Sequence, residues 1–418
     1  MSYKENHLMK NKYVPTIGAL YINYIFQGIA AIIISQNMSV LEGRWHASLS
    51  QITLVISAIG FGRVLSVNIA GLISDALGRR KAVILGVISY VIFYIGLILS
   101  TNYMVAFAFA IFAGIGNSFL DTATYPVVVE AFEEHNSNSA LSVLNKAFIS
   151  VGQFLLPIIT SFLLANHFYF GWTFIASAFF LVLNVFFLLK LPFPTIKKDR
   201  PVETPTEAEL LAESKPLWNQ SNFAIEGVCL LIFSLVSVSL FNIFIIWIPT
   251  FAEEVVGIAR TDSLMFVSLY SVFSFISVFI TSVIVKKGVN VVSFMIFCTS
   301  ISALAIFILL MLPNLYTLVL ATFCIGFFAA GGIWQLGLAT LLDFFPQRRG
   351  LVTSYYSLAT SVSVMGSPYI TGILAENNIE WVFYLITSLA MLGTLVLSIV
   401  AYRYKKVFLS ETTIISIR

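Results

Sequence analysis

Twelve apolar runs, each long enough to cross a lipid bilayer, divide this chain and leave little room for any other kind of fold. A membrane-spanning helix needs about 20 apolar residues. Charged residues make up only 10% of the chain, against about 25% in a soluble domain. We therefore predict an all-α membrane protein of twelve transmembrane helices. The runs are 14–38, 50–73, 82–100, 103–129, 142–165, 169–191, 222–249, 262–285, 290–312, 315–342, 351–374 and 379–402.

The longest polar segment, residues 192–221, separates the sixth run from the seventh. Within it, Thr204-Pro205-Thr206-Glu207 has the order of an N-cap, a first-turn proline and a capping glutamate, which predicts a short surface helix. We expect an N-terminal six-helix bundle over 1–191, this segment as a cytoplasmic linker, and a C-terminal six-helix bundle with a tail over 222–418.

The two predicted bundles look like copies of one unit. The sequence from Glu130 to Pro157 resembles that from Asp343 to Pro368. Each begins with an acidic residue, has an aromatic residue two positions later and ends with a proline. Such a parallel repeat predicts two pseudo-symmetric bundles. The second copy lacks counterparts of two charges of the first, Arg63 and Asp75, so the polar machinery is expected mainly in the first bundle.

The turn between the second and third runs reads Gly71-Leu72-Ile73-Ser74-Asp75-Ala76-Leu77-Gly78-Arg79-Arg80-Lys81. We expect Gly71 to permit close packing of a neighbouring helix and Gly78 to supply a positive φ. The spacing Gly-x-x-x-Asp-x-x-Gly-Arg-Arg resembles the loop 2–3 signature of the major facilitator superfamily. An ordinary basic membrane hairpin is the alternative.

This resemblance implies two bundles that rock about a central site. It also implies a gating role, through salt bridges that break and reform, for residues at the cytoplasmic ends of the helices. The alternative is that they anchor the loops statically. They are Gly71, Asp75, Gly78, Arg79 and Arg80 in the loop, Glu130 and Asp343 at the ends of the fourth and tenth runs, and Arg348 and Arg349 before the eleventh.

Two ionisable side chains, Arg63 and Asp121, lie deep inside predicted spans. At 1.5 Å per residue, Arg63 lies about 18 Å from Asp75 and Asp121 lies about 13 Å from Glu130, both of which are at cytoplasmic turns. The two charges are therefore near the middle of a hydrocarbon core about 30 Å thick. An isolated charge there is costly, so we expect them to interact directly, through water or through a solute. They could be a fixed ion pair, or Asp121 could couple transport to protons while Arg63 holds an anionic or hydroxyl-rich solute.

Uncharged polar side chains in the spans are further candidates, because polar groups in bilayer helices usually face protein or a cavity. They serve either as contacts between helices or as solute ligands. Asn117, Asp121 and Tyr125 are spaced four apart and form one helical stripe. The other candidates for solute binding are Asn23, Gln27, Gln153, Asn242, Trp334 and Gln335.

No pattern typical of an enzyme, a metal site or a bound cofactor occurs, and no phosphate-binding glycine loop indicates ATP-driven transport. We expect a monomeric secondary transporter in the plasma membrane of a bacterium that imports a small polar solute (a sugar, a sugar acid or an organic anion) together with protons. The alternatives are a multidrug/proton antiporter and a transport-dead sensor. Its partners would be the solute, H⁺ and the lipid bilayer, not nucleic acid.

Charge placement predicts the topology. With the N-terminus inside, all but three of the 23 Lys and Arg fall in segments assigned to the cytoplasm; the exceptions are Arg44 and Arg260 outside and Arg63 within a span. Short basic loops stay in the cytoplasm, so both termini and the linker are expected there. A cysteine placed at position 210 should therefore resist an impermeant thiol reagent added outside intact cells, and its labelling would contradict this topology.

Overall fold

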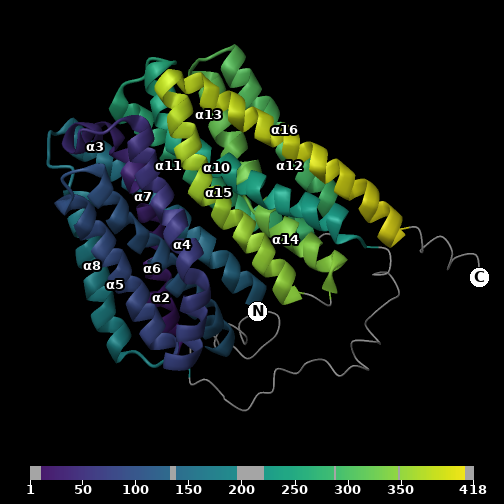
Figure 1. The fold of residues 1–418 in the computed structure, drawn as a ribbon, viewed down its shortest axis with the longest axis horizontal. Helices are drawn as coiled ribbons and strands as arrows, with labels where there is room; N and C mark the ends of the chain where they lie inside the picture. Colours follow the sequence, from purple (N-terminus) through teal and green to yellow (C-terminus); the bar gives the residue numbers. More distant parts are fainter. Residues whose placement is uncertain (1–10, 132–137, 195–220, 287–288, 347–348, 410–418) are drawn as a thin grey trace, which may run out of the picture.

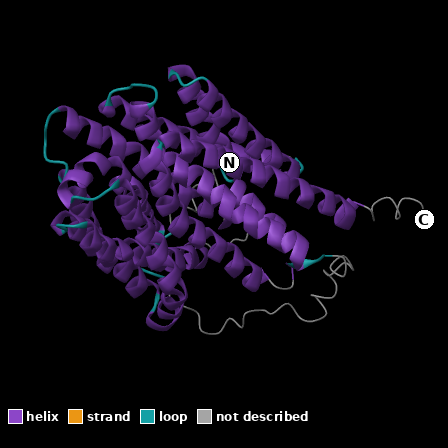
Figure 2. Ribbon diagram, turned by 45° about the horizontal axis from the view of Figure 1, so that its top comes forward, coloured by secondary structure: helices purple, strands orange, loops and turns teal. Residues whose placement is uncertain are grey.

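The computed structural model describes residues 11–131, 138–194, 221–286, 289–346 and 349–409. Within these residues the chain is helical throughout, with loops and turns between the helices and no strand (Figure 2). Twelve helical stretches are long and apolar enough to span a membrane, which confirms the predicted fold class. The predicted linker helix after Thr204 lies outside the described residues.

The spans of the first half largely follow the predicted runs. A short helix, α3 (Met38–Trp45), connects the first span to the second. The spans are α2 (Val14–Gln36), α4 (Leu49–Leu77), α5 (Arg79–Leu99), α6 (Tyr103–Ala131), α7 (Asn138–Ala165) and α8 (Trp172–Lys190).

The second half differs from prediction in one span. The tenth run is not one continuous helix but α13 (Leu315–Cys324), a π-helical turn η3 (Ile325–Ala329) and α14 (Ile333–Phe344), interrupted around Gly331 and Gly332. Gly332 has a φ of 112°, which ends the preceding helix. The remaining spans are η2 with α10 (Phe223–Gly227, Val228–Glu254), α11 (Arg260–Lys286), α12 (Val291–Met311), α15 (Arg349–Asn377) and α16 (Ile379–Tyr404), which continues into η5 (Lys405–Leu409).

Figure 1 shows α2, α4, α5, α6 and α8 on one side of the molecule and α10, α12, α14, α15 and α16 on the other. The two halves meet mainly where α4 packs on α15 and α7 packs on α11. Two prolines predicted to be equivalent, Pro157 and Pro368, lie inside α7 and α15, the corresponding helices of the two halves.

The polar contacts between the halves extend from the end of the molecule that carries α3 into the middle of the helices. Further inside, the Ser268 hydroxyl donates to the Phe154 carbonyl at 2.8 Å, and the Tyr369 N–H donates to the Ser57 hydroxyl at 3.1 Å. Two more lie at the α3 end itself. There the Ser50 N–H donates to Glu376 Oε1 at 3.0 Å, and the Ser161 hydroxyl donates to the Thr261 carbonyl at 2.9 Å. No hydrogen bond or ion pair between described residues joins the halves at the opposite end, which carries the residues nearest the termini. The halves are therefore latched at the α3 end.

Two glycines let α4 and α6 approach closely. A Cβ at Gly114 would overlap the Ile59 carbonyl oxygen, and one at Gly62 would overlap the Ile111 carbonyl oxygen. Gly71 was expected to serve the same purpose, but the structure contradicts this. A Cβ there would meet nothing within 4 Å, because Gly71 lies in the last two turns of α4, where no neighbour covers it.

Because of this difference, the same substitution should have opposite outcomes at two positions of α4 and α6. Gly114→Ala should destabilise the protein by about 1–3 kcal/mol through overpacking, whereas Gly71→Ala should leave the melting temperature unchanged or slightly raised. Thermal unfolding of the purified variants in detergent measures both. Equal melting temperatures for the two variants would contradict the close approach.

Candidate functional site

A cavity of about 290 Å³ lies between the two halves and is lined by both of them. Polar side chains converge on it from α2, α4, α6 and α7 in the first half and from α10, α14 and α15 in the second. Nine of the ten predicted solute-binding residues line this cavity. They are Gln27, Arg63, Asn117, Asp121, Tyr125, Gln153, Asn242, Trp334 and Gln335.

The tenth, Asn23, does not line it. Its side chain is fully buried and its Oδ1 accepts a hydrogen bond from Asn184 Nδ2 of α8 at 2.7 Å. Gln27, one turn further along α2, instead donates to Asn117 Oδ1 of α6 at 2.7 Å. Four residues advance a helix by more than one full turn, so the two amides point at different neighbours. Asn23 therefore takes the other predicted role, that of a contact between helices.

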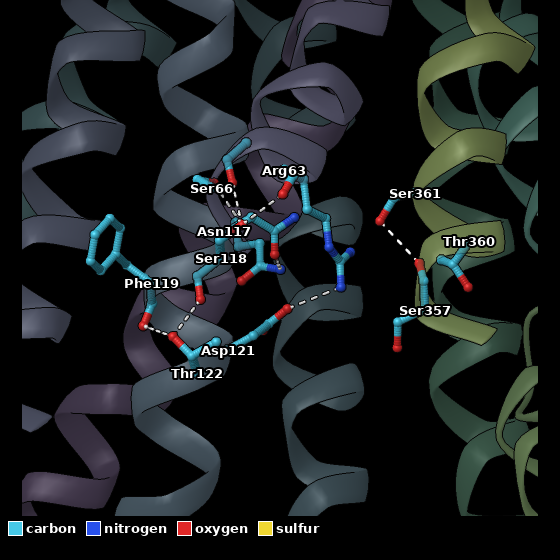
Figure 3. A network of polar contacts seen from close by, with 12 residues as sticks. Arg63, Ser66, Asn117, Ser118, Phe119, Asp121, Thr122, Ser357, Thr360 and Ser361 are labelled. Carbon is cyan, nitrogen blue, oxygen red and sulfur yellow. Dashed lines mark hydrogen bonds and ion pairs between the residues drawn. The ribbon is translucent and has the colours of Figure 1, made fainter. Parts of the chain in front are cut away.

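The two predicted buried charges pair directly. Arg63 Nη2 lies 3.3 Å from Asp121 Oδ2, across the contact between α4 and α6 (Figure 3). The Tyr24 hydroxyl donates to the other carboxylate oxygen, Asp121 Oδ1, at 3.2 Å. Both charged side chains keep about a quarter of their surface exposed, 28% for Arg63 and 21% for Asp121, so a solute or water in the cavity can reach them.

The opposite wall is fixed by hydrogen bonds between α14 and α15. Trp334 Nε1 donates to Thr360 Oγ1 at 2.8 Å, and the Tyr356 hydroxyl donates to the Trp334 carbonyl at 2.8 Å. These bonds leave the Trp334 ring at the cavity wall, where an aromatic face can stack on a solute. Figure 3 shows this part of α15, with Ser357, Thr360 and Ser361, opposite Arg63.

Sequence reasoning missed Lys146. We counted it with the cytoplasmic cations, but it lies more than two turns inside α7 and lines the central cavity. Its Nζ lies 4.9 Å from the centroid of the Phe241 ring, which belongs to α10 of the other half. The sequence carries the signal, because Lys146 falls within the predicted span 142–165, where a cation is as costly as Arg63.

The break between α13 and α14 was also missed, although Gly-Gly is a recognised interruption of a helical pattern and Gly331-Gly332 stands within the predicted tenth span. Short or glycine-interrupted membrane helices often mark the binding site of a transporter. Here Ala329, Ala330 and Gly332 at the break all line the cavity.

The predicted gating residues of the first half form one network around Arg79. Its guanidinium contacts Asp75 Oδ1 at 2.5 Å, Glu130 Oε1 at 3.2 Å and the Ser74 hydroxyl at 2.9 Å. Gly78 forms the turn with a φ of 93°, as predicted, so α5 can begin at Arg79.

The remaining predicted gating residues are placed less completely. Arg80 Nη2 donates to the Leu191 carbonyl at 2.6 Å and so ties the loop to the end of α8. Asp343 lies in the last turn of α14. Arg349 begins α15, while Arg348 lies outside the described residues.

The described part of the chain holds no group of three or more potential metal-ligating His, Cys, Asp or Glu side chains. Cys229, Cys298 and Cys324 are unpaired thiols. Two bundles of membrane-spanning helices around a shared cavity are the architecture of a membrane transporter.

Comparison with known proteins gives the family. The family model described as Major Facilitator Superfamily matches residues 20–293 and 289–413, and the chain belongs to this family. The chain is 33% identical over 405 residues to the inner membrane transport protein YdiM of Escherichia coli (strain K12), covering 95% of this chain and 96% of YdiM. It is 32% identical over 399 residues to YfkL, an uncharacterized MFS-type transporter of Bacillus subtilis (strain 168), covering 95% and 98%.

Solved structures share the fold. A crystal structure of a D-xylose-proton symporter matches with a TM-score of 0.72 at 14% identity, covering 92% of this chain and 96% of that chain. An inward open conformation of the E. coli xylose transporter XylE matches with a TM-score of 0.72 at 13% identity, covering 91% and 94%. At these identities the likeness concerns the fold alone.

Proposed function

We propose that this transporter moves a small polar solute, such as a sugar, a sugar acid or an organic anion, together with a proton by alternating access. The observation that carries the proposal is Asp121. Its carboxylate lines the cavity shared by the two halves and is held by one guanidinium and one hydroxyl, at 3.3 and 3.2 Å. A proton-coupled carrier needs such a titratable group at its central site, and a solute that engages Arg63 would favour protonation of Asp121.

The arrangement of the halves supports alternating access. They are latched at the α3 end and share no such contact between described residues at the opposite end. We propose that the opposite end, with both termini and the linker, faces the cytoplasm, because basic residues concentrate there. The conformation is then inward-facing.

The alternative, an exporter of cationic amphipathic drugs, finds less support in the cavity. Aromatic side chains such as Phe241 and Trp334 do line it, but so do Arg63 and Lys146. Two cations beside a single carboxylate repel a cationic solute.

Asp121→Asn tests the proton coupling. Without a titratable group the variant should still exchange solute across the membrane of proteoliposomes, but it should lose uphill accumulation driven by a pH gradient. The solute is the one that raises the melting temperature most in a screen of sugars, sugar acids, carboxylates and cationic dyes. Counterflow measures exchange, and net uptake under an imposed gradient measures accumulation.

A matched control is Asp262→Asn, which removes a carboxylate from the first turn of α11, outside the cavity. This variant should accumulate solute as the unmodified protein does. If Asp121→Asn still concentrates solute under the pH gradient, coupling lies elsewhere, and the Arg63–Asp121 pair reverts to a structural role.

We also propose a gating role for the network around Arg79. Asp75 is 71% exposed although it pairs with Arg79, so its carboxylate is free to exchange partners when the halves close at this end. Arg79 itself is nearly buried and is shared with Glu130, which keeps it in place during such an exchange. Closure would bring the loop toward the region between α14 and α15, where Asp343 and Arg349 lie.

Asp75→Ala should therefore slow transport while leaving solute binding unchanged. A loss of one charged contact worth about 1.4 kcal/mol in the rate-limiting closure would slow turnover about tenfold. The control is Lys81→Ala, which removes an exposed charge from the first turn of α5 that has no ion pair among the described residues, and this variant should transport normally. A folded Asp75→Ala variant that no longer binds solute would contradict the gating role.

A further inference from the structure

The charges that line the central cavity do not balance. Arg63 and Lys146 bring two positive charges, and Asp121 brings one negative charge. Asp121 is already engaged by Arg63 and by the Tyr24 hydroxyl. Lys146 has no ion pair within the described residues, because no carboxylate oxygen among them lies within 4.0 Å of its ammonium group.

Within the described part of the chain, the one partner of Lys146 is the face of the Phe241 ring, at 4.9 Å from the centroid. A cation–π contact attracts the ammonium but does not neutralise its charge. An unneutralised cation in a cavity between membrane helices is costly, and its presence in such a place points to an anion that binds there.

The break in the tenth span adds positive potential from the other half. Helix α14 begins at Ile333 directly at the cavity, and its N-cap residue, Gly332, has no side chain to accept hydrogen bonds from its first turn. The first backbone hydrogen bond that closes onto Gly332 comes from the Leu336 N–H, so the N–H groups of residues 333–335 have no intrahelical acceptor. An uncapped helix N-terminus attracts a carboxylate.

Two glutamine side chains at the cavity need a hydrogen-bond donor. Gln27 and Gln153 both line the cavity, and the Oε1 atom of each is buried and receives no hydrogen bond from any described residue. Gln153 is only 7% exposed as a residue. Buried acceptors of this kind cost free energy unless they receive a hydrogen bond, and a solute hydroxyl is a suitable donor.

We propose that the solute of this transporter is a small hydroxycarboxylate anion, with Lys146 as a residue that binds its carboxylate. This proposal rests on the proposed function and narrows its solute class. Lys146 of α7 and the N-terminus of α14 lie in different halves and border the same cavity, and the proposal places the carboxylate between them. The hydroxyl groups are left to the glutamine oxygens of α2 and α7. The cavity volume of about 290 Å³ limits the solute to a small molecule.

The test uses acids paired with neutral counterparts of matching carbon skeleton. Glycerate is paired with glycerol, gluconate with sorbitol, and galacturonate with galactose. Each is titrated against the purified full-length protein, and the shift of the melting temperature gives the apparent Kd. At least one acid should stabilise the protein, and its neutral counterpart should bind at least tenfold more weakly.

Lys146 variants identify the residue responsible. Lys146→Met should raise the Kd for that acid at least tenfold and leave the Kd for the neutral counterpart within a factor of two. Lys146→Arg, which keeps the charge, should recover most of the affinity. Lys190→Met, which removes an exposed lysine from the end of α8, should bind as the unmodified protein does.

Other results overturn the proposal in distinguishable ways. If a neutral sugar binds as tightly as its acid, or if Lys146→Met leaves acid affinity unchanged, the hydroxycarboxylate assignment is wrong while a polar-solute transporter remains. If none of the acids binds, the assignment is wrong as well. If only a cationic dye such as ethidium stabilises the protein, the proposed function itself fails and the efflux alternative replaces it.

Discussion

Buried charge between membrane helices is the constraint on which the rest of this structure depends. An arginine and an aspartate inside apolar spans cannot face lipid, so α4 and α6 must turn these residues toward the interior. The pair at 3.3 Å meets that requirement, and the glycines at 62 and 114 let the two helix backbones come close enough for it. The rotation of both helices, and with it the stripe Asn117, Asp121 and Tyr125 on the cavity wall, follows from this contact.

The sequence was most informative about features that depend only on the order of residues along the chain. Crossing a bilayer depends on length and hydropathy along the chain, so the twelve spans, the turn at Gly78 and the helical stripe of α6 could be predicted without knowing which helices are neighbours. Burial of a charge is likewise a local penalty, which is why pairing of Arg63 with Asp121 could be expected from their depth alone.

The sequence was least informative where the role of a residue depends on which helix packs against it. Asn23 and Gln27 are both predicted to bind solute, but Asn184 of α8 donates to the side chain of the first, and the second donates to Asn117 of α6. Gly71 looks like a packing glycine until the structure shows that no helix covers it. Lys146 was misjudged for a different reason, because its position near the start of a span allowed it to be grouped with loop cations, while the cavity in fact reaches that depth.

The asymmetry between the halves gives the site a way to link binding to motion. Side-chain charges come from the first half, while the uncapped N-terminus of α14 and the fixed Trp334 come from the second. A ligand drives a conformational change only by the difference in its binding free energy between the two states. A solute that contacts one half alone would bind both conformations equally and would not shift the equilibrium between them. An anion that contacts Lys146 and the α14 N-terminus together has a binding energy that depends on the distance between the halves, and that dependence is what alternating access requires.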